Sequence, residues 1–128
     1  MRGVFVTGTG TEVGKTVVAA AIARTLAASG ERVAVFKPAV TGLEESGEAD
    51  HELLRRAAGS AQSDAEIAPY RFQPPASPHL AAALAGEEIE PTRLLTAARA
   101  AAADADALVC EGVGGLLVPL RAGRLSQP

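Results

Sequence analysis

Near the start of the chain, two short apolar runs flank one long alanine-rich run. Residues 3–7 are apolar and β-branched and precede a glycine, which predicts a buried parallel strand. Residues 15–29 are apolar on nearly all sides, as in a helix between a sheet and other helices, with Gly30 as its C-cap. The run 33–36, stopped by Pro38, predicts a second strand. This order predicts a βαβ unit with a right-handed crossover, and therefore an α/β fold with a mostly parallel sheet.

The rest of the chain alternates between helical spacing, proline-bearing loops and one more apolar run. The predicted elements are a loop over 40–49, a helix over 50–58 stopped by Gly59, an irregular stretch over 60–77, a short helix from Pro78 to near Gly86 with Ser77 as N-cap, a helix over 91–103, a strand over 107–110 and a further apolar segment over 116–120.

A glycine-rich stretch, 7–16, lies between the first strand and the first helix and ends in Gly-Lys-Thr. Such a stretch in this context is typical of a phosphate-binding loop, in which backbone N–H groups and the helix N-terminus surround phosphate oxygens. Lys15 would reach the β- and γ-phosphates, and the hydroxyl of Thr16 would bind Mg²⁺. The usual spacing puts a glycine at position 9, which is Thr9 here, flanked by glycines. We therefore predict a variant loop with one extra residue, in a P-loop NTPase-like domain with helices flanking the sheet.

Three further charged residues are candidates for the same rim. Lys37 ends the second strand and Glu111 follows the third, and ligands of open α/β sheets bind at these carboxyl ends. The chain has only two lysines, Lys15 and Lys37, among twelve basic residues, which favours a role that a guanidinium would not serve. The less favoured interpretation of Lys37 is a surface lysine at a strand end. Asp50 is a candidate Mg²⁺ ligand or merely the N-cap of its helix, and the residues alone leave both open.

Composition excludes several classes of protein. With 128 residues and 48% hydrophobic content the chain is long enough for one domain with a core. The net charge of −3 and the lack of a basic cluster argue against nucleic acid or an anionic membrane as partner. No apolar run is long enough to span a membrane and no signal peptide is evident. The single cysteine, Cys110, excludes an internal disulfide, is expected to be a small buried hydrophobe, and fits a cytoplasmic location.

Several segments together resemble the dethiobiotin synthetase family, over nearly all of residues 3–120. The phosphate loop with its extra residue is similar to that family's loop, and Lys37-Pro-Ala-Val-Thr-Gly42 resembles its Lys-Pro-x-x-Ser/Thr-Gly segment. Pro69-Tyr-x-Phe72 and Ser77-Pro-His79 resemble its middle region. Glu111-Gly-Val-Gly-Gly115 is similar to its Glu-Gly-Ala-Gly-Gly, with Val113 in place of alanine. The order and spacing of these pieces make the resemblance specific.

The resemblance implies an ATP- and Mg²⁺-dependent ligase of biotin biosynthesis. The implied substrates are 7,8-diaminopelargonic acid, CO₂ and ATP, joined through a carbamate and its phosphoric anhydride. Lys37 and Lys15 would be catalytic, Thr41 would contact the substrate, and Thr16, Asp50 and Glu111 would hold the metal. The implied nucleotide-binding residues are Thr11, Glu12, Val13, Gly14, Lys15, Thr16, Val17, Asp50, Glu111, Gly112, Val113 and Gly114.

The strands predicted up to Pro128 are few for a sheet with both edges protected. We therefore expect residues 1–128 to be the N-terminal part of a single P-loop α/β domain. By the resemblance, adenine recognition and a homodimer interface would lie beyond Pro128.

Two other functions are compatible with the same fold. A partitioning-type ATPase switch would carry an extra lysine near the first glycine of the loop, and here that neighbourhood is Thr9-Gly10-Thr11. An ATP-dependent amidating ligase of cobalamin synthesis would need a glutamine-handling domain, for which this sequence offers no segment.

Overall fold

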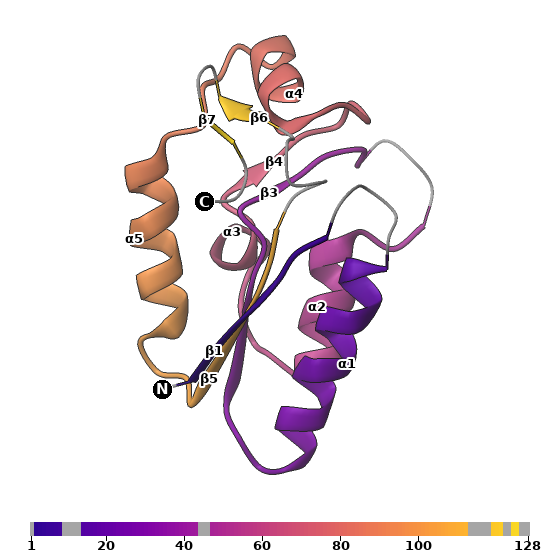
Figure 1. The fold of residues 1–128 in the computed structure, drawn as a ribbon, viewed down its shortest axis with the longest axis vertical. Helices are drawn as coiled ribbons and strands as arrows, with labels where there is room; N and C mark the ends of the chain where they lie inside the picture. Colours follow the sequence, from indigo (N-terminus) through magenta and orange to yellow (C-terminus); the bar gives the residue numbers. More distant parts are fainter. Residues whose placement is uncertain (1, 9–13, 44–46, 113–118, 122–123, 126–128) are drawn as a thin grey trace.

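The computed structural model describes residues 2–8, 14–43, 47–112, 119–121 and 124–125. The described part of the chain contains both helices and strands, and β1, α1 and β2 follow one another as a βαβ unit (Figure 1). The elements are β1 (Arg2–Val6), α1 (Lys15–Ala28), β2 (Val33–Phe36), β3 (Ala39–Val40), α2 (Asp50–Ala58), α3 (Asp64–Ile67), β4 (Tyr70–Arg71), α4 (Pro78–Leu84), α5 (Pro91–Ala102), β5 (Ala107–Glu111), β6 (Pro119–Arg121) and β7 (Arg124–Leu125).

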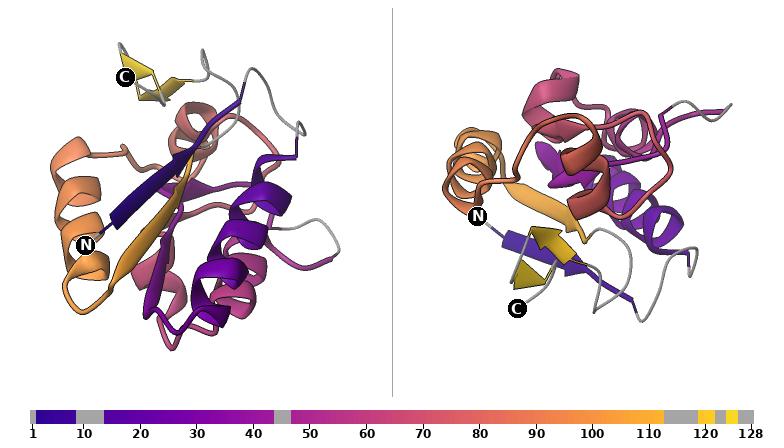
Figure 2. Two further views of the ribbon diagram at one scale, coloured as in Figure 1. Left: turned by 60° about the horizontal axis from the view of Figure 1, so that its bottom comes forward. Right: turned by 90° about the horizontal axis from the view of Figure 1, so that it is seen from above.

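The main sheet has three parallel strands in the order β1-β5-β2. The last of these three strands in sequence, β5, therefore lies between the other two, and its Val109 pairs with Val4 on one side and Val35 on the other. Helices α1 and α2 cover one face of this sheet, and α5 lies against the other (Figures 1 and 2). The predicted α/β fold with a parallel sheet and flanking helices is confirmed. All three strands end at the same edge, which brings Val6, Phe36 and Glu111 close to one another.

Alanine lets α1 lie close to the sheet. Ala19 and Ala23 are fully buried and pack in one cluster with Val35 and Val109 of the strands and Leu54 of α2. Because these side chains are small, the helix packs closely against the strands. This close packing fixes the distance between the start of α1 and the carboxyl ends of the strands. Cys110 is half-buried on the opposite face of the sheet, and burial raises the pKa of its thiol to about 11, which suits a packed, unreactive cysteine.

The stretch predicted to be irregular contains two short elements. Ser63 and Glu66 form a reciprocal capping box that begins α3, a signature that is visible in the sequence. Strand β4 pairs in parallel with β3, and Tyr70 and Phe72 form a second core cluster with Ile89. The prediction of a wholly irregular segment was wrong here, because pairing between two-residue strands leaves no periodic pattern.

The side chain of Gln62 pairs with the outer edge of β2. Its Oε1 accepts the N–H of Val35 at 2.9 Å, and its Nε2 donates to the Val35 carbonyl at 3.0 Å. The hydroxyl of Ser60 donates to the same Oε1 at 2.8 Å. A side-chain amide therefore satisfies backbone groups that an edge strand would otherwise leave unpaired.

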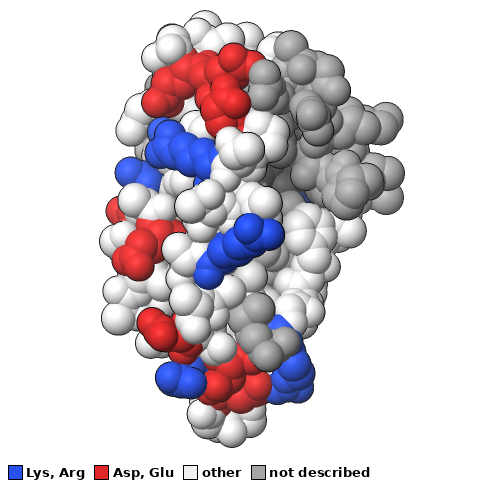
Figure 3. Space-filling view, turned by 90° about the vertical axis from the view of Figure 1, so that its left-hand side faces the viewer, with Lys and Arg blue, Asp and Glu red and all other residues white. Residues whose placement is uncertain are grey.

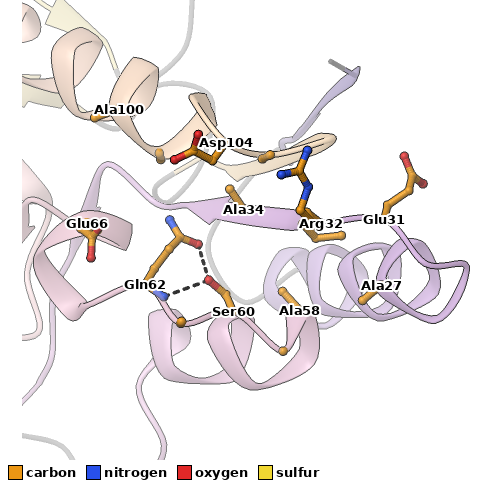
Figure 4. Close-up of a pocket in the computed structure, with 15 residues that line it drawn as sticks. Ala27, Glu31, Arg32, Ala34, Ala58, Ser60, Gln62, Glu66, Ala100 and Asp104 are labelled. Atoms are coloured by element: carbon orange, nitrogen blue, oxygen red, sulfur yellow. Dashed lines mark hydrogen bonds between the residues drawn. The ribbon is translucent and has the colours of Figure 1, made fainter.

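A hollow of about 660 Å³ lies beside Gln62, at the end of β2 opposite to Lys37 (Figure 4). Two of the charged residues that line it form ion pairs with residues outside the hollow, Arg32 with Asp106 and Glu31 with Arg2. Over the face that carries α5, acidic and basic side chains are interspersed (Figure 3). In the described part of the chain, no helix is long and apolar enough to cross a membrane.

Candidate functional site

The first turn of α1 is built to face an anion. Gly14, immediately before the helix, has a left-handed backbone with φ of 87°, which favours glycine and provides no capping side chain. No acidic residue lies in the first turn, so no carboxylate of that turn offsets the positive end of the helix dipole, and the turn suits an anionic ligand. That segment's Thr11, Glu12 and Val13 lie outside the described residues.

Lys15, the first residue of α1, is buried at 8% exposure. Its pKa is lowered, chiefly by burial and further by the nearby charge of Lys37, while Glu111 and Asp50 act in the opposite direction. The two lysines of the chain therefore share one electrostatic environment with two carboxylates, as expected for residues on the same rim.

Lys37, Glu111 and Thr16 form a buried hydrogen-bonded chain. The ammonium of Lys37 donates to Glu111 Oε2 at 2.5 Å, and the hydroxyl of Thr16 donates to Glu111 Oε1. Glu111 is fully buried and Lys37 is 5% exposed, so the interpretation of Lys37 as a surface lysine was wrong. Strands β2 and β5 are paired in register from Val33 to Phe36, which places Lys37 beside the end of β5.

Asp50 joins this cluster from α2. Its Oδ2 lies 3.5 Å from the ammonium of Lys37. The N-cap position of α2 is Ala49 and carries no side-chain cap, so Asp50 is the first helical residue and its interpretation as the N-cap was wrong. The structure leaves its carboxylate, about half exposed, turned toward the rim of the sheet.

The donor set suits a hard cation. The hydroxyl of Thr16 and the carboxylates of Asp50 and Glu111 are oxygen ligands of the kind that Mg²⁺ prefers. Among the described residues, no group of three His, Cys, Asp or Glu side chains could hold a metal ion. Oxygens from a nucleotide and from water would therefore have to complete the shell, as is usual for Mg²⁺.

The other predicted site residues are less closely connected to the cluster of Lys37, Glu111, Thr16 and Asp50. The carbonyl of Gly112 accepts from Lys37 at 3.4 Å, while its N–H donates to the Val6 carbonyl. Thr41 follows β3 and is half-buried, and no side-chain hydrogen bond joins it to this cluster in the described part of the chain. Val17 is 68% exposed on α1. Val113 and Gly114 lie outside the described residues.

His51 is a buried residue near the site, and no role for it was predicted from the sequence. It follows Asp50 on α2, is 2% exposed, and its Nε2 lies 3.4 Å from Oδ1 of Asp64 at the start of α3. Its Nδ1 has no hydrogen-bond partner among the described residues. Asp64 also pairs with Arg55, so His51 and Arg55, one turn apart, connect α2 to α3. In the sequence, His51 belongs to no motif, so nothing there indicated that it would be buried.

We expect the fold to become less stable as the pH is lowered, because of His51. Burial lowers its pKa below 6.5, against the opposite effect of Asp64 and Glu52 and with minor support from Arg55 and Arg71. The unfolded chain then binds the proton first, so stability is full above about pH 6.5 and falls as the pH drops toward the lowered value. Urea unfolding from pH 7.5 to 5 should show this slope, and His51→Leu should flatten it. The exposed His79 serves as control: an equal flattening in His79→Leu would contradict the assignment.

The sequence model of the family described as AAA domain matches residues 2–127. The chain belongs to this family. Membership agrees with the parallel sheet and the glycine-rich turn before α1, and it confirms the P-loop type of α/β fold.

The chain is similar to curated proteins of the family that its motifs resemble. The chain is 48% identical over 122 residues to the "ATP-dependent dethiobiotin synthetase BioD" of Anaeromyxobacter dehalogenans (strain 2CP-C), covering 95% of this chain and 55% of that protein. It is 42% identical to the protein of the same name from Nitrosospira multiformis, over 93% of this chain and 53% of the relative. It is 39% identical to "ATP-dependent dethiobiotin synthetase BioD 1" of Escherichia coli O157:H7, over 91% and 53%.

The similarity to dethiobiotin synthetases is thus confirmed, and the chain spans about half the length of the curated relatives it matches.

Proposed function

We propose that the protein takes part in biotin biosynthesis as an ATP-dependent dethiobiotin synthetase. The observation that carries the proposal is the buried chain of Thr16, Glu111 and Lys37 beside the start of α1, within a sequence that resembles enzymes of that name. A phosphate-binding turn alone would fit any nucleotide-binding protein. A second buried lysine on the same rim adds a cation for charge that develops on a transferred phosphoryl group.

The proposed reaction has three steps, taken from the resemblance. One amine of 7,8-diaminopelargonic acid attacks CO₂ and loses a proton to give a carbamate. An oxygen of the carbamate attacks the γ-phosphorus of ATP and ADP leaves. The second amine attacks the carbamate carbon, phosphate leaves, and the loss of one more proton completes the ureido ring of dethiobiotin.

Residue roles in this proposal follow from position. The amides at the start of α1 and Lys15 hold the triphosphate, and Lys37 stabilises charge between the carbamate and the γ-phosphate. Mg²⁺ held by Thr16, Asp50 and Glu111 would neutralise phosphate oxygens. Thr41, on the segment after β3, is proposed to contact the diamine.

The proposed enzyme needs more residues than those of the described structure. We propose that residues 1–128 are part of one P-loop α/β domain, and that adenine contacts and a homodimer interface come from further residues. The relatives, about twice as long as the matched segment, support this view. A cytoplasmic location belongs to the same proposal.

The test is an assay with 7,8-diaminopelargonic acid, ATP, Mg²⁺ and labelled bicarbonate. We expect the label to become acid-stable in dethiobiotin, with one ADP released for each product formed, because the anhydride is consumed by ring closure. ATP turnover without incorporation of label would show that the assignment is wrong. Omitting the diamine is the matched control, and it should abolish both signals.

A further inference from the structure

The ammonium of Lys37 sits among oxygen atoms in the manner of a bound cation. Among the described residues, three oxygens surround it: Glu111 Oε2 at 2.5 Å, the Gly112 carbonyl at 3.4 Å and Asp50 Oδ2 at 3.5 Å. The other oxygen of Glu111 is taken by the hydroxyl of Thr16. Because Glu111 is fully buried, its charge needs a positive partner, and Lys37 supplies it.

The same oxygens are those proposed for the metal. Asp50 and Glu111 cannot serve a divalent ion fully while each faces the ammonium of Lys37, because two cations a few ångströms apart repel each other strongly in a buried site. The Thr16 proton that now points at Glu111 would likewise have to turn away for its oxygen to act as a ligand. Binding of a metal ion therefore requires these partners to change.

The charges of the cluster also balance. Asp50 and Glu111 contribute two negative charges, and Lys15 and Lys37 contribute two positive charges in their protonated forms. The cluster thus presents no excess of negative charge to a free divalent cation. Phosphate oxygens of a nucleotide would supply that excess, so the metal and the nucleotide are expected to arrive together.

We propose that Lys37 is a built-in counter-cation of the metal site: its ammonium neutralises Asp50 and Glu111 until a metal–nucleotide complex binds, and the metal then displaces it. This inference rests on the proposed function, since it uses the metal ligands assigned there. Displacement frees the ammonium for the carbamate and the γ-phosphate only after the nucleotide is in place. The exchange would therefore couple loading of the site to the availability of its second lysine.

The first experiment measures Mn²⁺ binding by electron paramagnetic resonance in the absence of nucleotide. Lys37→Met removes the competing charge at similar length, so we expect its affinity for Mn²⁺ to exceed that of the wild type on the order of tenfold or more. Lys15→Met is the matched control, because it removes one charge from the same environment without vacating the oxygens around Lys37. Equal gains in both variants, or no gain in Lys37→Met, would overturn the proposal.

The second experiment observes the exchange in the wild-type protein and needs a variant only to assign the signals. With only two lysines in the sequence, lysine labelled with ¹³C at Cε gives two NMR signals, which Lys15→Met assigns. A non-hydrolysable ATP analogue in EDTA should shift mainly the Lys15 signal, and subsequent Mg²⁺ should shift that of Lys37. A Lys37 signal that stays in place when the metal is added would contradict the exchange.

These outcomes are separate from those of the proposed reaction. If Mg²⁺ moves Lys37 but no dethiobiotin forms, the exchange stands and the proposed reaction is wrong. If dethiobiotin forms while Mg²⁺ leaves Lys37 unmoved and Lys37→Met gains no affinity for Mn²⁺, the reaction stands and the exchange is wrong.

Discussion

The Lys37→Met protein should lose dethiobiotin formation while it still binds nucleotide. We expect kcat to fall on the order of 10²–10³-fold, the range found when one preorganised group that stabilises transition-state charge is removed. Nucleotide affinity measured in EDTA, where no metal competes with Lys37, should change far less than kcat, because the first turn of α1 and Lys15 are intact and Lys37 follows a different element, β2. The measurement pairs the labelled-bicarbonate assay with equilibrium binding of a fluorescent ATP analogue.

Two controls separate chemistry from structure in this experiment. Arg99→Met removes a positive charge from an exposed position of α5 and should leave both kcat and nucleotide binding unchanged. Circular dichroism must show that Lys37→Met is folded, since the variant leaves buried Glu111 with one partner fewer. A folded Lys37→Met protein with wild-type kcat would remove Lys37 from the proposed mechanism.

The Glu111→Ala substitution should produce the largest loss of stability. Glu111 is fully buried and accepts hydrogen bonds from both Lys37 and Thr16, so its removal leaves a buried ammonium without its principal partner. Breaking such a pair from one side costs about 3–5 kcal/mol of unfolding free energy. Urea denaturation followed by circular dichroism measures this loss.

A double-mutant cycle tests whether the loss comes from the pair itself. In Glu111→Ala combined with Lys37→Met, neither member of the pair remains buried without the other, so the loss should be smaller than the sum of the two single losses. Simple additivity would show that Lys37 and Glu111 are not coupled, and it would also remove the basis for the cation exchange. Glu87→Ala, at an exposed position after α4, should have little effect on stability.

Some of the site could be predicted because its signals are local. The strand, the glycine-rich turn and the helix that begins at Lys15 follow each other directly in the chain, and strand ends at Lys37 and Glu111 are visible from the apolar runs before them. The rule that parallel strands share a carboxyl edge was enough to group these residues. The roles assigned to Thr41, Val17 and the loop residues remain predictions.

Other features could not be predicted because they depend on partners far along the chain. Pairing of β3 with β4 joins two-residue strands, which are too short for a periodic pattern. Asp50 has the same local sequence whether it caps its helix or faces the rim, and only the packing of α2 against α1 and the sheet decides between them. His51 is buried by the contact between α2 and α3, which its sequence neighbours do not indicate.

By itself, the sequence determined the parallel α/β class of the P-loop type and the similarity to dethiobiotin synthetases, because glycine placement, apolar runs and motif order are written along the chain. Only the tertiary structure decided that Lys37 is buried and that it shares Glu111 with Thr16. Those contacts join residues 74 and 95 positions apart. They exist because β5 inserts between β1 and β2, so that the register of the strands, rather than any local preference, brings Lys37 and Glu111 to one edge. The packing of α1 and α2 against the sheet then adds Lys15, Thr16 and Asp50.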